Sequence, residues 1–193
     1  MKLSFRRRRE HRTNYRLRKK LILSGLPLFY VFRSLRYITV SFIIPKPEGD
    51  YTVAAACSKE LMKRFGLVSG KNLPAAYLTG LLAGARAKKA GISKAIINLG
   101  VAWSKKASIP FAAAQGARDA GIEIPIGEEA LVDWKRIRGE HIANYAKLLK
   151  QTDIERYKRM FSQYLEKNLD PESLPEKFDQ IREVLLKEAS SNG

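Results

Sequence analysis

Cysteine and histidine are scarce in this chain of 193 residues, which contains one cysteine and two histidines. The lone Cys57 cannot form an intramolecular disulfide and cannot build a cysteine metal site, which fits a reducing compartment. We interpret Cys57, at the end of an apolar strand, as a small buried side chain rather than a nucleophile. His141, in the string GEHI, lacks the second histidine that a zinc protease needs, so we interpret it as a capping or packing residue. We expect no metal and no other cofactor.

Long apolar runs are also absent. The most apolar stretches, LILSGLPLFYVF and LPAAYLTGLLAGA, do not approach the roughly 20 residues that a membrane-spanning helix needs. The basic start of the chain is not followed by an uninterrupted apolar segment and a small-residue cleavage site, so we expect no signal peptide. These features predict a soluble protein that has no membrane partner.

Acidic residues are few compared with basic ones, and the imbalance is uneven along the chain. The formal net charge is +17 and the isoelectric point is about 10.1. Residues 1–36 hold 12 Lys or Arg and one acidic residue, residues 37–122 hold 12 and four, and residues 123–193 hold 12 and 14. Like charge at this density destabilises a compact fold by self-repulsion, so it indicates a polyanionic partner, and nucleic acid comes first.

The sequence patterns of common enzyme classes are missing as well. Gly80 and Gly84 are not followed by the Lys and Ser or Thr that complete a phosphate-binding loop. A two-metal nuclease needs carboxylates on its strands, and the expected strands PLFYVFRS, YITVSFII and AIINLG contain none. We therefore expect no enzyme and no small-molecule substrate.

What is present predicts an α/β fold with a mixed sheet that begins as an antiparallel meander. β-branched and aromatic residues dominate PLFYVFRSLRYITVSFII on both sides of a short turn at Ser34 and Leu35. After a turn rich in proline and glycine, YTVAAAC supplies a third strand, and KAIINLG reads as a further, buried strand. The order of strands and helices favours a sheet flanked by helices.

Three helices are expected between and after these strands. Ser58 is expected to cap a short helix that ends at Gly66. A longer helix runs from about Pro74 to Lys89, and its many alanines and glycines imply very close packing against a sheet or another helix. FAAAQGARDAG reads as another small-residue helix, followed by the short extended piece IEIPIG.

The last part of the chain is slightly acidic and reads as helices. Thr152 and Glu155 match a capping box, and Pro175 fits the first helical position of a second helix. The expected inward faces contain Ile154, Tyr157, Phe161, Tyr164 and Leu165 in the first helix, and Phe178, Ile181, Val184 and Leu185 in the second. We predict three parts: a basic arm at 1–24, an α/β core at 25–130, and a helical extension at 131–193 packed on the core or on a neighbour.

The strongest candidate binding segment is the arm sequence RRRREHRTNYRLRKK, residues 6–20, in which nine of fifteen residues are basic. Arginine side chains provide forked donors for phosphate oxygens, while Asn14 and Tyr15 suit exposed bases. A solvated tail or a nuclear-import signal is the alternative reading. The apolar residues threaded through its end, such as Leu17 and Leu21, are expected to anchor it.

Three further segments are weaker candidates for RNA contact. Arg33 and Arg36 flank the hairpin turn, although such residues are also common solubilising groups. Lys71 and Asn72 precede the amino terminus of the small-residue helix, which favours phosphate but equally suits an ordinary helix cap. The loop WSKKASIPF is basic and carries Trp103, which suits either base stacking or the core.

Four strings in the sequence match a known family in order. They are FRRRREHRTNYRLRKKL at 5–21, NLPAAYLTGLLAGARA at 72–87, GARDAGIEIPIGEE at 116–129 and RIRGEHI at 136–142. The chain resembles the 5S-rRNA-binding large-subunit ribosomal proteins of the L-eighteen family, in the archaeal and eukaryotic branch. The loop WSKKASIPF departs from the pattern of that family, in which a longer run with Gly and Arg precedes the phenylalanine–alanine pair.

The resemblance implies a cytoplasmic ribonucleoprotein component that binds 5S rRNA and large-subunit rRNA in the central protuberance, beside neighbouring ribosomal proteins. It implies no catalysis, and it implies that the arm lies between the two RNAs. The expected RNA-binding residues are Arg6, Arg7, Arg8, Arg9, Arg12, Asn14, Tyr15, Arg16, Arg18, Lys19, Lys20, Arg33, Arg36, Lys71, Asn72, Lys105, Lys106 and Ser108. A general RNA-binding factor, such as a chaperone or regulator that uses the same arm, is the alternative.

Overall fold

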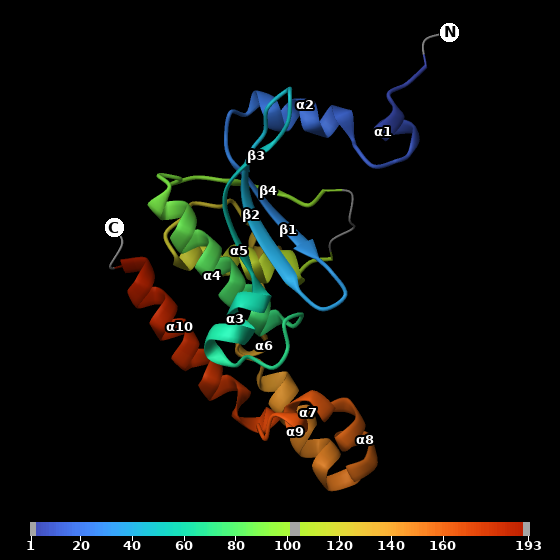
Figure 1. Cartoon of the computed structure of the whole chain (residues 1–193), viewed down its shortest axis with the longest axis vertical. Coiled ribbons are helices and arrows are strands. Elements are labelled where there is room, and N and C mark those ends of the chain that lie inside the picture. Colours follow the sequence, from blue (N-terminus) through green and yellow to red (C-terminus); the bar gives the residue numbers. More distant parts are fainter. Residues whose placement is uncertain (1–2, 101–104, 191–193) are drawn as a thin grey trace.

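The computed structural model describes residues 3–100 and 105–190, and its centre is a four-stranded mixed sheet (Figure 1). Strands β1 (Leu28–Arg33), β2 (Ile38–Ile44) and β3 (Tyr51–Cys57) form the predicted antiparallel meander. Strand β4 (Ile96–Asn98) pairs in parallel with β1, so the sheet order is β3-β2-β1-β4. The predicted mixed sheet is confirmed, although β4 is a short, half-buried edge strand rather than a buried one.

One face of the sheet is apolar because side chains alternate along each strand. In the β1–β2 pair, Phe29 lies opposite Phe42 and Val31 lies opposite Val40. Ile38, Val40 and Phe42 are fully buried, whereas Ile44, at the end of the same strand, is 38% exposed. A register shift between Phe42 and Ile43 in the β2–β3 pairing loosens the alternation at this end.

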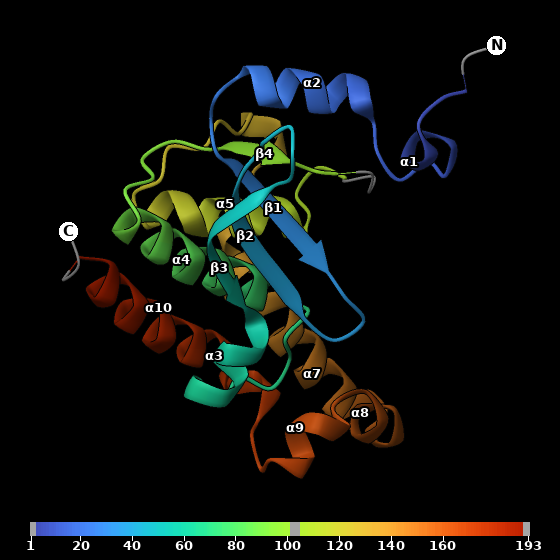
Figure 2. The ribbon, with the colours of Figure 1, turned by 45° about the horizontal axis from the view of Figure 1, so that its top comes forward.

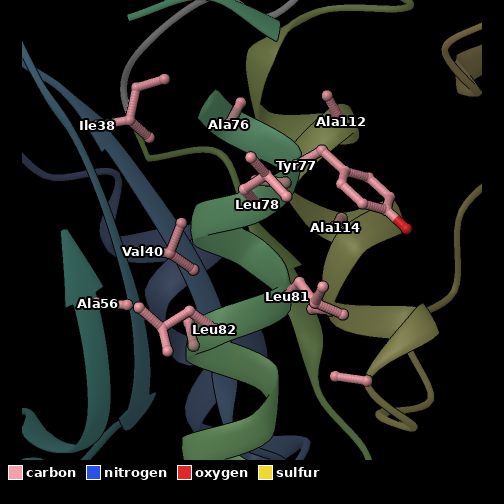
Figure 3. Close-up of a cluster of buried hydrophobic side chains, with 14 of the residues drawn as sticks. Ile38, Val40, Ala56, Ala76, Tyr77, Leu78, Leu81, Leu82, Ala112 and Ala114 are labelled. Carbon is pink, nitrogen blue, oxygen red and sulfur yellow. The ribbon is translucent and has the colours of Figure 1, made fainter. Parts of the chain in front are cut away.

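Helices α4 (Leu73–Lys89) and α5 (Ile109–Asp119) cover this apolar face. Both views show the two helices side by side on one side of the strands (Figures 1 and 2). In the core, Leu82 of α4 lies beside Val40 and Ala56, while Tyr77 and Leu81 lie on the side of α5 (Figure 3). All five of these residues are buried, and they belong to the main hydrophobic core.

The close packing that the small residues predict is confirmed, and the partner of α4 is α5. A Cβ atom placed on Gly80 would lie 1.9 Å from the carbonyl oxygen of Ala113. On the facing helix, a Cβ on Gly116 would lie 2.1 Å from the carbonyl oxygen of Tyr77. Each glycine therefore gives room to the backbone of the other helix, and no larger residue fits at either position.

Helix α3 (Ser58–Phe65) ends as predicted at Gly66, which has a positive φ of 65°. Its cap was predicted wrongly, because Cys57 is the N-cap residue and forms a capping box with Glu60. Ser58 is instead the first helical residue and is fully buried. Its hydroxyl accepts a hydrogen bond from the Ile38 backbone N–H and donates one to the Gly70 carbonyl, so it fastens two loops together.

The C-terminal part is helical, as predicted, and it contains more helices than the sequence indicated. After a 3-10 turn, Glu128–Ala130, come α6 (Trp134–Arg138) and α7 (Glu140–Thr152). Helices α8 (Ile154–Met160) and α9 (Ser162–Glu166) follow, and a second 3-10 turn, Pro171–Ser173, leads into α10 (Leu174–Ser190).

The expected single helix after Thr152 is broken at Phe161, between α8 and α9. Its cap is Asp153, whose carboxylate accepts from the Arg156 backbone N–H at 2.9 Å, so the predicted capping box of Thr152 and Glu155 is wrong. Thr152 instead ends α7 and donates to the Leu148 carbonyl. The break changes the inward face: Tyr157, Phe161 and Tyr164 are buried in a small second core, whereas Ile154 and Leu165 are exposed.

Helix α10 packs on the main core beside α4. Phe178, Ile181 and Leu185 are buried as predicted, but Val184 is 41% exposed and does not face inward. Side-chain bonds add to this contact: the Arg182 guanidinium donates to the Tyr77 hydroxyl at 2.9 Å and lies 4.9 Å from the centre of the Trp134 ring. The boundaries of the three predicted parts of the chain stay a prediction. No helix within the described residues combines the length and apolar character that a membrane crossing requires.

Candidate RNA-binding surface

The arm folds as two helices, α1 (Arg6–Arg9) and α2 (Tyr15–Leu23), that lie beyond one end of the sheet (Figures 1 and 2). Asn14 caps α2, because its side-chain oxygen accepts a hydrogen bond from the Leu17 backbone N–H at 3.1 Å. Tyr15 packs against Phe5, with 5.1 Å between the ring centres. Neither arm helix contains a buried residue, so the charged side chains of the arm are open to solvent.

Within the arm, one carboxylate forms ion pairs with two arginines. Glu10 pairs with Arg6 at 2.9 Å and with Arg12 at 3.4 Å, and Arg7 donates to the Thr13 hydroxyl. Such exposed pairs contribute little to stability, so they leave these arginines available to another anion. The basic arm residues without an ion-pair partner within the described ranges are Arg7, Arg8, Arg9, Arg16, Lys19 and Lys20.

Arg18 has a different role from the other arm arginines. Its guanidinium donates two hydrogen bonds to the Asp50 carboxylate, at 2.8 and 3.0 Å, and one to the Lys46 carbonyl. The hydrogen bond that Arg18 donates to the Asp50 carboxylate raises the pKa of Arg18 above its usual value. Arg18 therefore ties α2 to the loop between β2 and β3, and this anchor has a counter-ion of its own.

Two grooves follow the arm where it meets the sheet. The larger has a volume of about 450 Å³, and among its lining residues are Arg8, His11, Arg16 and Gly100. The second is lined by Arg12, Arg18 and Asn98 together with apolar residues of α2 and β1 and with Pro45. Leu17 and Leu21 lie in this second groove with the buried Leu28, which agrees with the prediction that they anchor the arm.

At the other end of the strands the structure brings together three of the predicted contacts. Arg33 and Arg36 flank the hairpin turn, and both are exposed. The backbone of Gly70 packs against the Arg36 carbonyl, since a Cβ on Gly70 would lie 3.1 Å from that oxygen. Lys71 follows directly, so the tip of the hairpin and the start of α4 form one basic corner.

Asn72 acts as the cap of α4, because its side-chain oxygen accepts from the Ala75 backbone N–H at 3.0 Å. The alternative of an ordinary helix cap is therefore correct for Asn72, and contact with RNA at this position stays a prediction. The same is true of Asn14 in the arm. Both asparagines begin helices whose amino ends carry the partial positive charge that favours phosphate.

The basic loop before α5 is only partly described, and Trp103 lies outside the described residues. Lys105 is exposed, while Lys106 forms an ion pair with Glu129. Ser108 is the N-cap residue of α5. Of the three contacts expected here, Lys105 and Lys106 are exposed, whereas Ser108 is half-buried at the start of α5.

Cys57 and His141, the remaining residue types that could act in catalysis or metal binding, have contacts that suit a structural role. Cys57 is half-buried, and its sulfur accepts a hydrogen bond from the Thr39 hydroxyl at 3.7 Å. The His141 side chain on α7 is exposed at its surface but partly desolvated by its neighbours; this partial burial and then the nearby Arg136 charge lower its pKa. Within residues 3–100 and 105–190, no group of three or more His, Cys, Asp or Glu side chains is arranged to hold a metal ion.

Two aromatic side chains near this surface were not singled out from the sequence. Tyr30 and Phe32 alternate with the core residues Phe29 and Val31, so they lie on the face of the sheet away from α4 and α5. Phe32 is 54% exposed. The alternation was visible in LFYVFR, but both sets of side chains are apolar, so the pattern did not indicate which set faces the core.

Comparisons with known proteins show the family to which the chain belongs. Residues 1–93 match the sequence model of the family described as ribosomal large subunit proteins 60S L5, and 50S L18. Large ribosomal subunit protein uL18 of Staphylothermus marinus is 46% identical over 188 residues, which cover 97% of this chain and 93% of that protein. The chain belongs to this ribosomal protein family.

Two further relatives extend over almost the whole chain. Large ribosomal subunit protein uL18 of Thermofilum pendens is 46% identical over 184 residues, or 95% of this chain and 94% of the relative. The protein of the same name in Desulfurococcus amylolyticus is 45% identical over 186 residues, or 96% and 94%. The resemblance seen in the four sequence strings is thus confirmed. The family consists of structural proteins of the large ribosomal subunit in the cytoplasm, and it is not a family of enzymes.

Proposed function

We propose that this chain binds 5S rRNA and helps to attach it to the large rRNA in the central protuberance of the large ribosomal subunit. The observation that carries the proposal is the basic surface of the arm and hairpin tip, in a chain that belongs to a large-subunit ribosomal protein family. The choice of 5S rRNA as the partner rests on the family resemblance.

The arm suits a role in packing RNA rather than in reading its sequence. Its arginines and lysines are exposed and provide donors for phosphate oxygens on several sides of two short helices. Neutralised phosphates release their counterions, which lowers the repulsion between RNA helices that lie close together. Double-stranded RNA is recognised chiefly through its backbone shape and its 2′-hydroxyls, so base readout is a minor contribution of the arm.

The anchor of the arm fits this role. Arg18 and Asp50 hold α2 to the β2–β3 loop, while Leu17 and Leu21 contact the groove beside Leu28. The folded core therefore fixes where the arm leaves the domain, and α1 projects beyond it (Figure 1). An arm held at its base but exposed along its length can lie between two RNA segments.

The C-terminal helices have a separate part in the proposal. Helices α7, α8 and α9 lie at the end of the molecule opposite to the arm (Figures 1 and 2). Residues 123–193 carry no basic surplus, so we propose that this end faces neighbouring ribosomal proteins or rRNA of the central protuberance rather than 5S rRNA.

The test is the salt dependence of binding to 5S rRNA. Replacing Arg8, Arg9 and Arg16 by glutamine removes three charges that lack ion-pair partners among the described residues. Each lost phosphate contact should flatten the slope of log affinity against log salt concentration by about 0.7–0.9, so we expect a change of about 2. The matched control replaces Arg156, Lys158 and Arg159 of α8 by glutamine and should leave the slope unchanged.

Two results would count against the proposal. If the arm variant and the α8 variant change the slope equally, the binding surface is not the arm. If an unrelated structured RNA of equal length competes as well as 5S rRNA, the chain is a general RNA-binding factor instead.

A further inference from the structure

We propose that the face of the sheet opposite α4 and α5, between the arm and the hairpin tip, binds unpaired RNA bases, which stack on Phe32 and Tyr30. The inference rests on the proposed RNA binding and adds a ligand class to it. It extends the binding surface from phosphates, which the arm neutralises, to bases outside a duplex.

The first argument is the composition of this face. The pairing register puts Phe32, Thr39 and Cys57 in one row and Tyr30, Ser41 and Ala55 in the next. Asn98 extends the second row on β4. These rows contain no charged side chain, and α4 and α5 lie on the opposite side of the strands. The face is therefore a neutral surface with two aromatic rings.

The second argument is the exposure of Phe32, which is 54% despite its position within a strand. Its cross-strand partner is Thr39, which is too small to cover a phenyl ring. The exposed surface of the Phe32 ring is apolar, so a flat apolar partner that stacks on it would bury that surface away from water.

The third argument is the charge at the two ends of the face. At one end, Gly100 packs on the Tyr30 ring, since a Cβ there would lie 3.1 Å from ring atom Cε2, and Gly100 also lines both arm grooves. At the other end, Arg33 and Arg36 flank the hairpin turn beside Phe32. The face thus presents basic residues, then aromatic rings, then basic residues. A short RNA segment fits this order if its outer phosphates contact the two basic ends and its bases lie on the rings between them.

The carboxylate that contacts the end of β3 is neutralised. Glu60 forms an ion pair with Arg86 and accepts a hydrogen bond from the Cys57 backbone N–H at 3.0 Å. These contacts, with the hydrogen bond from Arg86 as the largest cause, lower the pKa of Glu60. Among the described residues, no acidic side chain lies in the two rows of this face, and the carboxylate at the end of β3 is paired with Arg86.

The ligand class follows from the geometry of stacking. Bases within a duplex are already stacked on each other, so only unpaired bases of loops, bulges or ends can lie on a protein ring. Stacking on an aromatic side chain is tolerant of sequence, because every base has a flat face. The expected ligand is therefore single-stranded RNA, or an unpaired segment of a folded RNA.

The test compares three variants of the full chain. Phe32→Ala removes the ring, Phe32→Tyr keeps it, and Leu35→Ala removes a 90% exposed apolar side chain from the hairpin turn as a control. Both positions are exposed, so the fold should be retained. We expect Phe32→Ala to weaken binding to 5S rRNA and to a single-stranded RNA of mixed sequence by about 10- to 100-fold. Phe32→Tyr and Leu35→Ala should bind as the wild type does.

A second binding experiment uses a fully paired RNA duplex of the same length as the single-stranded RNA. Phe32→Ala should leave the affinity for the duplex and the salt slope unchanged, because stacking involves no phosphate. Equal losses for duplex and single strand would overturn the inference, as would an effect of Leu35→Ala equal to that of Phe32→Ala. Unchanged RNA binding by Phe32→Ala, with weaker binding to another ribosomal protein, would assign the face to a protein and would also overturn it.

The outcome separates this inference from the proposed function. If the arm variant flattens the salt slope while Phe32→Ala has no effect, RNA binding by the arm stands and base stacking fails. If the wild-type chain binds none of these RNAs in a salt-dependent way, the proposed function itself fails.

Discussion

Gly80 and Gly116 set the distance between the two helices that cover the sheet. Each glycine faces a backbone carbonyl of the other helix, at Ala113 and at Tyr77, so the helices approach to backbone contact. The close approach allows a row of alanines in α5, from Ala112 to Ala114, to be fully buried against α4. A single added methyl group would have no space in this interface.

Gly80→Ala should therefore destabilise the fold by about 3 kcal/mol, because a Cβ 1.9 Å from the Ala113 carbonyl oxygen forces the helices apart. The control is Gly49→Ala, at a position with no atom within 4 Å of an added Cβ. It should change the free energy of unfolding by less than about 0.5 kcal/mol. Urea unfolding of both variants measures the difference, and equal stabilities would contradict the observed helix contact.

Single residues also show what could be learned from the sequence. The small residues in α4 indicated very close packing, and the structure confirms it, but they did not reveal whether α4 packs closest on the sheet or on α5. The answer depends on Gly116, which lies in a different helix. In the arm, the role of Arg18 depends on Asp50, 32 positions away, so a local pattern of arginines could not separate an anchor from a binding group.

At the scale of elements, α10 is part of the core rather than a loosely attached helix. Phe178 contacts the Tyr77 and Trp134 rings, with centres 5.5 and 6.0 Å apart, and Arg182 bonds to the Tyr77 hydroxyl. The Tyr77 hydroxyl in turn donates to Asp119 of α5. Burial, followed by this hydrogen bond, raises the pKa of Tyr77 well above its usual value, so the hydroxyl keeps its proton and its place in the network.

Phe178→Ala should thus cost about 3–5 kcal/mol of the free energy of unfolding, since it leaves a cavity in the main core. Val184→Ala, on the same helix but 41% exposed, should cost about 0.5 kcal/mol. Thermal or urea unfolding measures both values. If Phe178→Ala were as mild as Val184→Ala, α10 would not belong to the core.

The elements that were predicted well are those with a strong local pattern. The strands of the meander show alternation of apolar residues, and α4 and α5 contain closely spaced small residues. Both patterns agree with the tertiary contacts that these elements make. The predicted capping box at Thr152 was wrong because the neighbouring Asp153 caps α8 instead. The predicted inward position of Val184 was wrong because Phe178, Ile181 and Leu185 are the residues of α10 that enter the core, while Val184 is 41% exposed. Tertiary contacts decide such choices, and a local pattern does not contain them.

At the scale of the whole molecule, the basic surplus is confined to the part of the chain that forms the arm and the core. The arm and the hairpin tip carry exposed basic side chains at the two ends of the sheet, while the C-terminal helices at the far end of the molecule carry no basic surplus. The sequence was sufficient to predict the basic end and the family. It could not show that Arg36 and Lys71 meet in one corner, because the chain between them folds through two strands and a helix.

The most direct test of RNA binding by the arm is crosslinking of purified large ribosomal subunits, with the crosslinked peptides and nucleotides mapped by mass spectrometry. We expect arm residues 6–20 to crosslink to 5S rRNA and to the large rRNA, and residues of α8 to crosslink to other components of the subunit. Crosslinks from α8 to 5S rRNA, together with an arm that crosslinks to protein alone, would contradict the account.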